Sequence, residues 1–254
     1  RQQLGFGQTD TGMTDLIEWV WRYWVRDDEL AYARSGVLKQ LGEIEADTFT
    51  RGAAVDRLDS ALLIALGSLE RAGVLRTRNE RIQFTHDLQA HWARYRLLLG
   101  IDERTVFAEL KQRVQSPRWH RAIRFYGQHL IEQDADGLSR WRRAIQALHV
   151  DSPEDCALSD LLLESVIVSP DAGNLIEALW PDLTADHGRL LRRLLRHFLH
   201  VGTVPDPRLA LIAVDHSASD DLRASMRVPA GPYWNVLLPA LHKHVDDLCK
   251  LDWF

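Results

Sequence analysis

Apolar residues along the chain recur mostly at helical spacing, three or four positions apart, and strictly alternating β-branched runs are nearly absent. A first helix is expected from Thr14 to about Val25, with Thr14 as its N-cap and Glu18 near the capping-box position. Its aromatic residues surround more than one face, which favours packing between neighbouring elements over packing against a missing domain. These aromatic residues are Trp19, Trp21, Tyr23 and Trp24.

Between residues 27 and 100 the expected elements follow the order of a winged helix. Three helices are expected, over residues 29–46, 53–56 and 60–72. Gly73 ends the third helix in the manner of a glycine C-cap. Two short apolar runs, Val74-Leu75 and Ile82-Gln83-Phe84, then flank the polar stretch 76–81, and this pattern predicts a β-hairpin wing. The hairpin is the only convincing β signal in the sequence.

From residue 101 onward, helix is expected to follow helix. Breaks are expected at Ser116-Pro117, 134–137, 151–153, Ser169-Pro170, Trp180-Pro181, 205–207 and 229–232. The clearest helix runs from Gly188 to Val201, with leucines and Phe198 on its apolar side. On its opposite side a solvated face is favoured over a strip that binds RNA or anionic lipid. The arginines of that side are Arg189, Arg192, Arg193 and Arg196.

The pattern as a whole predicts a mainly α protein with a small β-hairpin. The expected organisation is a linker and lead helix over 1–26, a winged-helix domain over 27–100 and an α-helical array over 101–254. Because no exact repeat is found, the array is expected to be a degenerate solenoid of helical pairs.

Composition narrows the class of protein. The 254 residues are 46% hydrophobic and 26% charged, which is ordinary for a globular protein. Only two cysteines occur, so neither a disulfide framework nor a paired-cysteine zinc site is expected, and a cytoplasmic location fits. No apolar run approaches 18 residues, so no membrane span is expected. A net charge of −5 makes nucleic acid an unexpected partner, and the missing initiating Met suggests a piece of a longer chain.

Patterns that announce an active site are missing from the sequence. The phosphate-loop pattern G-x-x-x-x-G-K-[ST] does not occur, nor do G-x-S-x-G and H-E-x-x-H. The chain is therefore not expected to be a complete enzyme. Two sets of residues have the spacing of metal ligands, but both spacings are common by chance, and no metal site is expected. These sets are His197 with His200, and His242 with Asp246, close to His244 and Cys249.

One histidine stands out by its position. His86 lies between the apolar run that ends at Phe84 and an amphipathic stretch that carries Leu88, Trp92 and Tyr95 on one side. From that junction its ring can reach out of the domain and donate a hydrogen bond to an anion. The alternative is a helix-entry histidine bonded to a nearby backbone carbonyl, and the chemistry alone favours that alternative.

The stretch from Gly73-Val-Leu through Ile-Gln-Phe-Thr-His-Asp-Leu to Trp-Ala-Arg resembles the winged-helix region of the STAND (NACHT-like) NTPases. The later Leu-Leu-Arg-Arg-Leu-Leu-Arg-His-Phe-Leu-His-Val-Gly-Thr is similar to the superhelical segment of large bacterial STAND proteins. The resemblance implies that His86 contacts the phosphate of ADP in a closed state. It also implies that the NTPase core, with ATP or ADP and Mg, lies upstream of this chain in the full-length protein.

The resemblance further implies a role in bacterial defence signalling. In that role the chain relays ligand sensing to oligomerisation, and its partners are the upstream NTPase domain and a protein ligand or further copies of itself.

Two other functions compete with this one. A winged-helix DNA-binding regulator is suggested by arginines around the expected wing, which are Arg71, Arg76, Arg78 and Arg81. A helical-repeat scaffold with a protein partner is suggested by the nine tryptophans, since tryptophan often anchors interfaces.

Overall fold

The computed structural model describes residues 12–132, 135–148, 152–207 and 226–253. These residues are mainly helical, with a small antiparallel sheet, which confirms the predicted fold class. The chain divides into two compact units, unit 1 over Arg1–Leu162 and unit 2 over Leu163–Phe254. None of the described helices is both long and apolar enough to cross a membrane.

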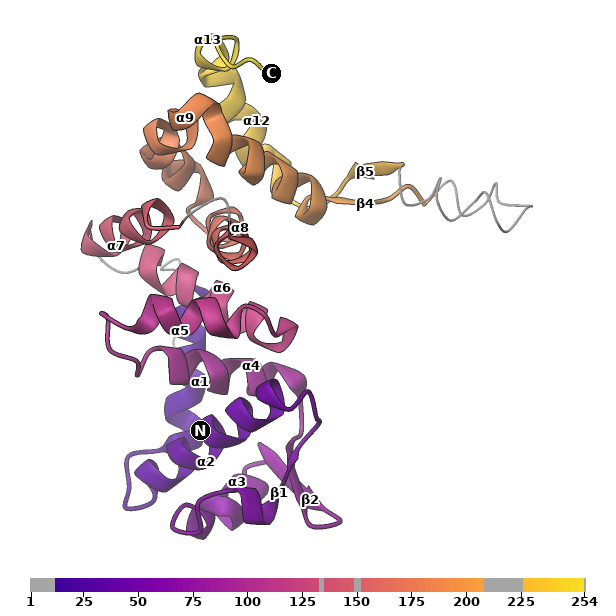
Figure 1. Ribbon diagram of the computed structural model, residues 1–254. Coiled ribbons are helices and arrows are strands. Elements are labelled where there is room, and N and C mark those ends of the chain that lie inside the picture. Colours follow the sequence, from indigo (N-terminus) through magenta and orange to yellow (C-terminus); the bar gives the residue numbers. More distant parts are fainter. Residues whose placement is uncertain (1–11, 133–134, 149–151, 208–225, 254) are drawn as a thin grey trace. The chain divides into compact units, whose positions relative to one another are not determined.

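Unit 1 is built around helix α4 (Figure 1). Its helices are α1 (Met13–Val25), α2 (Ala31–Asp47), α3 (Leu66–Arg71), α4 (Asp87–Leu98), α5 (Val106–Arg113), α6 (Pro117–Glu132), α7 (Ala135–Gln146) and the first part of α8 (Pro153–Ile167). Helix α4 packs against α2 on one side and α6 on the other. Gly42 lets α2 and α4 approach closely, since a Cβ atom there would lie 3.3 Å from the Cβ of Ala93. The buried core includes Val37, Leu38, Leu41, Leu98, Trp119 and Ile123.

The sheet of unit 1 has three antiparallel strands in the order β1-β3-β2. They are β1 (Ala53–Ala54), β2 (Leu75–Arg78) and β3 (Arg81–Phe84). The predicted hairpin is confirmed, with Leu75 opposite Phe84, although the strands extend into the expected turn. Only Asn79 and Glu80 remain between them, both at positive φ (49° and 59°), as a two-residue hairpin turn requires.

The helix expected over residues 53–56 is wrong. Ala53 and Ala54 pair with β3, and only a 3-10 turn, η1 (Val55–Arg57), follows. Gly52 turns the chain into this strand at φ 77°, and a Cβ atom there would lie 2.6 Å from the carbonyl oxygen of Ile82. Alanine favours helices intrinsically, but here pairing with an open strand edge decides the structure.

The helix expected over residues 60–72 is shorter than predicted. Its α-helical part is α3, which a 3-10 turn, η2 (Leu63–Ala65), precedes.

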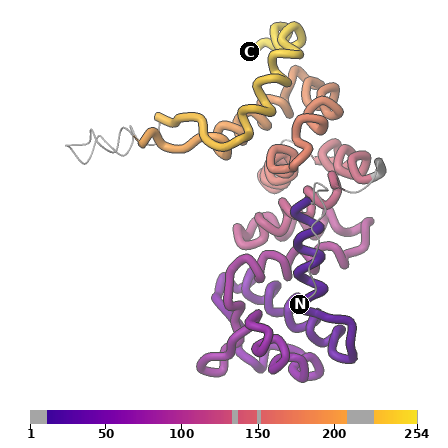
Figure 2. The backbone as a smooth tube through the Cα atoms, turned by 180° about the vertical axis from the view of Figure 1, so that it is seen from behind, coloured from indigo at the N-terminus to yellow at the C-terminus, as the bar shows by residue number. Residues whose placement is uncertain are grey.

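Helix α1 ends at Val25, as predicted, but its predicted cap is wrong. The N-cap is Gly12, and Thr14 lies inside the helix, where its hydroxyl donates to the carboxylate of Glu132 on α6. Helix α1 packs against α2 and α6 (indigo in Figure 2). Trp21 and Trp24 are buried, and the ring of Trp24 lies 5.4 Å from that of Trp92 on α4, whereas Trp19 and Tyr23 are 47% and 62% exposed. Packing between neighbours therefore accounts for one face of the helix and leaves the other open.

The division into units differs from the expected boundaries at residues 26 and 100. Helix α1 packs on α2 and α6, and α4 packs on α6, so both expected boundaries lie inside unit 1. The observed division falls within α8. Whether the later helices form a degenerate solenoid stays a prediction.

Unit 2 contains α9 (Ala172–Val201), β4 (Thr203–Pro205), β5 (Arg227–Pro229), α12 (Trp234–Lys243) and α13 (Val245–Leu248). The break expected at Trp180-Pro181 is wrong, because α9 continues through Pro181. The helix bends later, where residues 185–188 leave helical geometry. The β4–β5 pair is a second sheet that the sequence did not indicate. Of the other expected breaks, residues 134 and 151 lie outside the described residues.

Candidate functional site

His86 lies at the junction between β3 and α4, as predicted, and it is the N-cap of α4. Its Nδ1 accepts a hydrogen bond from the N–H of Leu88 at 3.1 Å. The N–H of His86 in turn donates to Oε1 of Gln89 at 2.9 Å, so the two side chains form a capping box. His86 is therefore a helix-entry histidine bonded to nearby backbone, which was the alternative to an anion-binding role. Its backbone partner is an N–H group and not the expected carbonyl.

The cap determines where His86 carries its proton. Because Nδ1 accepts from a backbone N–H, the neutral ring must carry its proton on Nε2. The side chain is exposed, and its Nε2 has no partner among the residues that the structure describes. The ring therefore presents an N–H donor to solvent, held in one orientation by the helix that it caps.

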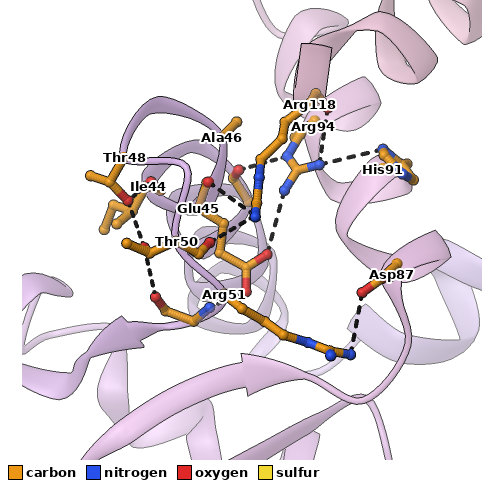
Figure 3. Close-up of polar contacts among 12 residues, drawn as sticks. Ile44, Glu45, Ala46, Thr48, Thr50, Arg51, Asp87, His91, Arg94 and Arg118 are labelled. Atoms are coloured by element: carbon orange, nitrogen blue, oxygen red, sulfur yellow. Dashed lines mark hydrogen bonds and ion pairs between the residues drawn. The ribbon is translucent and has the colours of Figure 1, made fainter. Parts of the chain in front are cut away.

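A pocket of about 350 Å³ lies beside the same helix (Figure 3). It is lined by Glu45, Arg51, Asp87, Ala90, His91, Arg94 and Arg118. Four of these residues come from α4, at positions i, i+3, i+4 and i+7 of one helical face. The others come from the end of α2, the loop that follows it and the start of α6.

At the back of the pocket Arg94 and Glu45 form a buried ion pair, with Nη2 and Oε2 3.4 Å apart. Figure 3 shows the guanidinium of Arg94 between Glu45 and His91. Nε of Arg94 donates to the carbonyl oxygen of Gly42 at 2.8 Å, and Oε1 of Glu45 accepts from the N–H of Gly52 at 2.6 Å. The pair thus ties α2, α4 and the turn before β1 to one another.

Burial opposes charge on both members of the pair. It lowers the pKa of Arg94 to about 10, against the attraction of Glu45, so the guanidinium stays charged at neutral pH. Burial also raises the pKa of Glu45, while the Gly52 N–H and the Arg94 charge act in the opposite direction.

At the rim of the pocket the contacts are looser. Nη2 of Arg51 lies 3.4 Å from Oδ1 of Asp87, and both side chains are mostly exposed. Arg118 is half-buried, and its Nη1 donates to the backbone carbonyl oxygens of Thr50 and Glu45 at 2.7 and 3.3 Å. The rim therefore has two guanidinium groups that are not held by buried carboxylates.

His91 is half-buried in an electropositive surrounding. Burial, followed by the charges of Arg94 and Arg121, lowers its pKa to about 4, against an opposing effect of Asp87 that exceeds the lowering by Arg124. Its Nδ1 lies 3.3 Å from Nη1 of Arg94. Since arginine has no acceptor, Nδ1 must be the acceptor and the proton of the neutral ring lies on Nε2.

Sequence reasoning identified His86 but missed the pocket, which His86 does not line. The available signal was the polar stripe of Asp87, His91 and Arg94 along one face of α4. Its partners Glu45 and Arg118 are distant in the chain, and nothing in the pattern indicates that they meet.

The two basic faces named from the sequence are only partly free. On the hairpin side, Arg71 donates to the carbonyl of Gly67, and Arg81 donates to that of Gly52. Arg76 and Arg78 are exposed on β2. On α9, Arg189 lies 3.7 Å from Asp186, Arg192 lies over the ring of Trp253, and Arg196 is exposed. Arg193 is half-buried and also has an interaction partner.

Two of the histidines in or near the metal-like spacings, His197 and His244, pair with carboxylates in unit 2. His197 lies 3.4 Å from Glu164, and His244 lies between Glu177 and Asp247, stacked on the ring of Trp180. Across the described parts of the chain, no three His, Cys, Asp or Glu side chains converge as a metal site would require.

Comparisons with protein-family models and with curated proteins returned no match to this chain.

Proposed function

We propose that the chain is a non-catalytic regulatory module of a STAND-type NTPase, in which His86 reads the phosphate of a nucleotide held by a separate NTPase core. The observation that supports this proposal is the outward Nε2–H of His86. The capping box orients the ring, so donating to a phosphate oxygen would cost little additional ordering.

In this proposal the nucleotide acts through differential affinity. ADP held by both the core and His86 favours the closed arrangement, and its exchange for ATP, with Mg in the core, releases it. The partners are the NTPase domain and a protein ligand or further copies of the chain. The setting is bacterial defence signalling in the cytoplasm.

The test is the dissociation rate of ADP from a protein that contains both this chain and its NTPase core. His86→Ala removes both the cap and the outward donor. His86→Asn keeps a good N-cap acceptor and lacks the imidazole Nε2–H. We expect both variants to release ADP about tenfold faster than the wild type, since a charge-assisted hydrogen bond contributes roughly 1.5 kcal/mol. If only His86→Ala released ADP faster, loss of the helix cap would explain the result. That outcome would contradict a nucleotide role for His86.

The chain by itself should not bind ADP at micromolar concentration, because the phosphate loop and the metal ligands lie elsewhere in this proposal. Isothermal titration with ADP and Mg checks this. Stoichiometric micromolar binding to the isolated chain would place the nucleotide site within it and refute the division of roles.

A second candidate function, a scaffold for protein partners, is favoured by the open face of α1. Met13, Leu16, Trp19 and Tyr23 are each at least 39% exposed, and the rings of Trp19 and Tyr23 stack with centroids 6.5 Å apart. Exposed apolar stripes of this kind mark interaction surfaces. Sedimentation of wild type and a Trp19→Ser/Tyr23→Ser variant tests self-association, with Tyr32→Ser, 85% exposed on α2, as the control.

The DNA-binding alternative predicts salt-dependent duplex binding in a mobility assay. Arg76→Gln and Arg78→Gln on β2 should then weaken it. Helix α3, which precedes the hairpin, has only six residues, and this short length counts against readout of a major groove.

A further inference from the structure

We propose that the pocket between the end of α2, helix α4 and the start of α6 binds a phosphate group of a small molecule. The proposal does not depend on the function proposed above. The pocket lies along one face of α4, whereas His86 caps the N-terminus of that helix and does not line the pocket. The isolated chain is sufficient to test the proposal.

The first argument is the balance of charge. Arg51, Arg94 and Arg118 line the pocket, against the two carboxylates of Glu45 and Asp87. Arg121 and Arg124 on α6 act on the same region, since both lower the pKa of His91. Guanidinium groups bind phosphate in bidentate geometry, and several together define an anion site.

The second argument is that the resident carboxylates satisfy these arginines poorly. The Arg94–Glu45 and Arg51–Asp87 pairs each have a single N···O contact at 3.4 Å, longer than a charge-assisted hydrogen bond. Asp87 is 81% exposed, so its side chain can leave Arg51 at little cost. An entering anion would take the place of Asp87 at the rim.

The third argument is the set of donors left over. The hydrogen bonds of Arg118 within the described residues use Nη1 alone, so Nε and Nη2 remain available. The proton of neutral His91 lies on Nε2, which likewise has no partner among those residues. With Arg51, these groups supply donors from the loop, α4 and α6.

These donors select a phosphate over a carboxylate. A carboxylate has two oxygens and a single charge, and two carboxylates in the pocket already leave the donors unused. A phosphate monoester brings three oxygens and nearly two charges near neutral pH. The pocket, at about 350 Å³, is within the size range of small-molecule sites, so a bare ion would leave most of it to water or to the rest of a larger ligand.

The experiment is titration of the isolated chain with inorganic phosphate at low ionic strength, followed by ¹⁵N NMR of the α4 amides and by isothermal calorimetry. We expect saturable binding in the millimolar range that perturbs the amides of residues 87–94. Acetate, tested in parallel, should bind at least about tenfold more weakly, because it has one charge and fewer acceptors. Equal binding of acetate would overturn the assignment to phosphate.

Three variants locate the site. Arg51→Gln should weaken phosphate binding about tenfold, the effect of losing one hydrogen bond to a charged group. Asp87→Asn should strengthen phosphate binding several-fold, because it removes the competing carboxylate. Arg76→Gln removes the same charge from β2, outside the pocket, and should bind as the wild type does. All three positions are exposed, so the fold is expected to survive.

Two results would refute the proposal. One is the absence of saturable phosphate binding up to about 50 mM, well above the range expected for such a site. The other is an equal loss of affinity in Arg51→Gln and Arg76→Gln, which would indicate nonspecific attraction to positive charge.

Discussion

Glu45 near the end of α2 and Arg94 on α4 form an ion pair in which both side chains are at most 5% exposed. Each charge is also bonded to backbone, Glu45 to the N–H of Gly52 and Arg94 to the carbonyl of Gly42. A buried pair of this kind adds little net stability relative to an apolar pair, but removing one partner leaves the other charge uncompensated.

We therefore expect Arg94→Leu to lower the free energy of unfolding by about 3 to 5 kcal/mol. Glu45→Leu/Arg94→Leu should lose less than the sum of the two single variants, because neither charge is then left alone. Arg51→Gln, which breaks the exposed pair with Asp87, serves as the control and should cost less than about 1 kcal/mol. Urea unfolding followed by NMR of unit 1 measures all four. An additive double variant would show that the two charges do not interact.

His91 should make the chain sensitive to acid. In the unfolded chain its ring takes up a proton near pH 6.5, whereas in the folded state its pKa is lowered to about 4. Stability from this group is present above pH 6.5 and is lost as pH falls to about 4, by about 3 kcal/mol in all. The raised pKa of Glu45 acts in the opposite direction, so the comparison must be made against a variant.

His91→Gln should remove this part of the pH dependence. Urea unfolding of wild type and variant between pH 4 and 7 isolates the difference. Parallel pH profiles would show that the histidine titrates alike in the folded and unfolded states.

Two glycines at positive φ allow the energetic cost of backbone strain to be measured separately from the cost of steric crowding. Gly52 has φ 77°, and a Cβ atom there would lie 2.6 Å from the carbonyl oxygen of Ile82. Gly73 has φ 70°, but a Cβ atom would have no neighbour within 4 Å. Gly73→Ala should cost about 1 kcal/mol from backbone conformation alone, whereas Gly52→Ala should cost at least about 2 kcal/mol more. Thermal unfolding compares them, and similar costs would indicate that β1 can shift away from β3.

Thr14 should contribute to the docking of α1. Its hydroxyl donates to the half-buried carboxylate of Glu132, whose pKa is raised by burial and held down in part by this bond. Thr14→Val keeps the shape and removes the donor, so it should cost about 1 to 3 kcal/mol and raise the pKa of Glu132 further. Thr14→Ser, which keeps the hydroxyl, is the control. Hydrogen exchange along α1 reports the effect, and equal protection in both variants would contradict it.

Local pattern was sufficient to predict the hairpin and the end of α1. A short polar stretch, 76–81, separates two apolar runs, as in a hairpin, and the residues of α1 have helical spacing. Pattern was insufficient for β1, because Ala53 and Ala54 form a strand only when the edge of β3 is available. The same applies to β4 and β5, which are three residues each and pair across a long separation.

The candidate site likewise has one part that local sequence predicts and one part that it does not. The position of His86 follows from neighbours within a few residues, because a cap is a local structure. The pocket depends on Glu45 and Arg118, which meet only when α2 and α6 both pack on α4. No spacing rule along the chain relates those residues.

The pairing of β1 with β3 has a dynamic consequence. Gly52, which leads into β1, bonds through its N–H to Glu45 and through its carbonyl to the guanidinium of Arg81 on β3. The hairpin cannot swing outward without pulling this turn and breaking the bond to the buried carboxylate. We therefore expect the hairpin and this turn to open as one cooperative unit, so that the amide protons of Gly52, β2 and β3 exchange with solvent at a common rate.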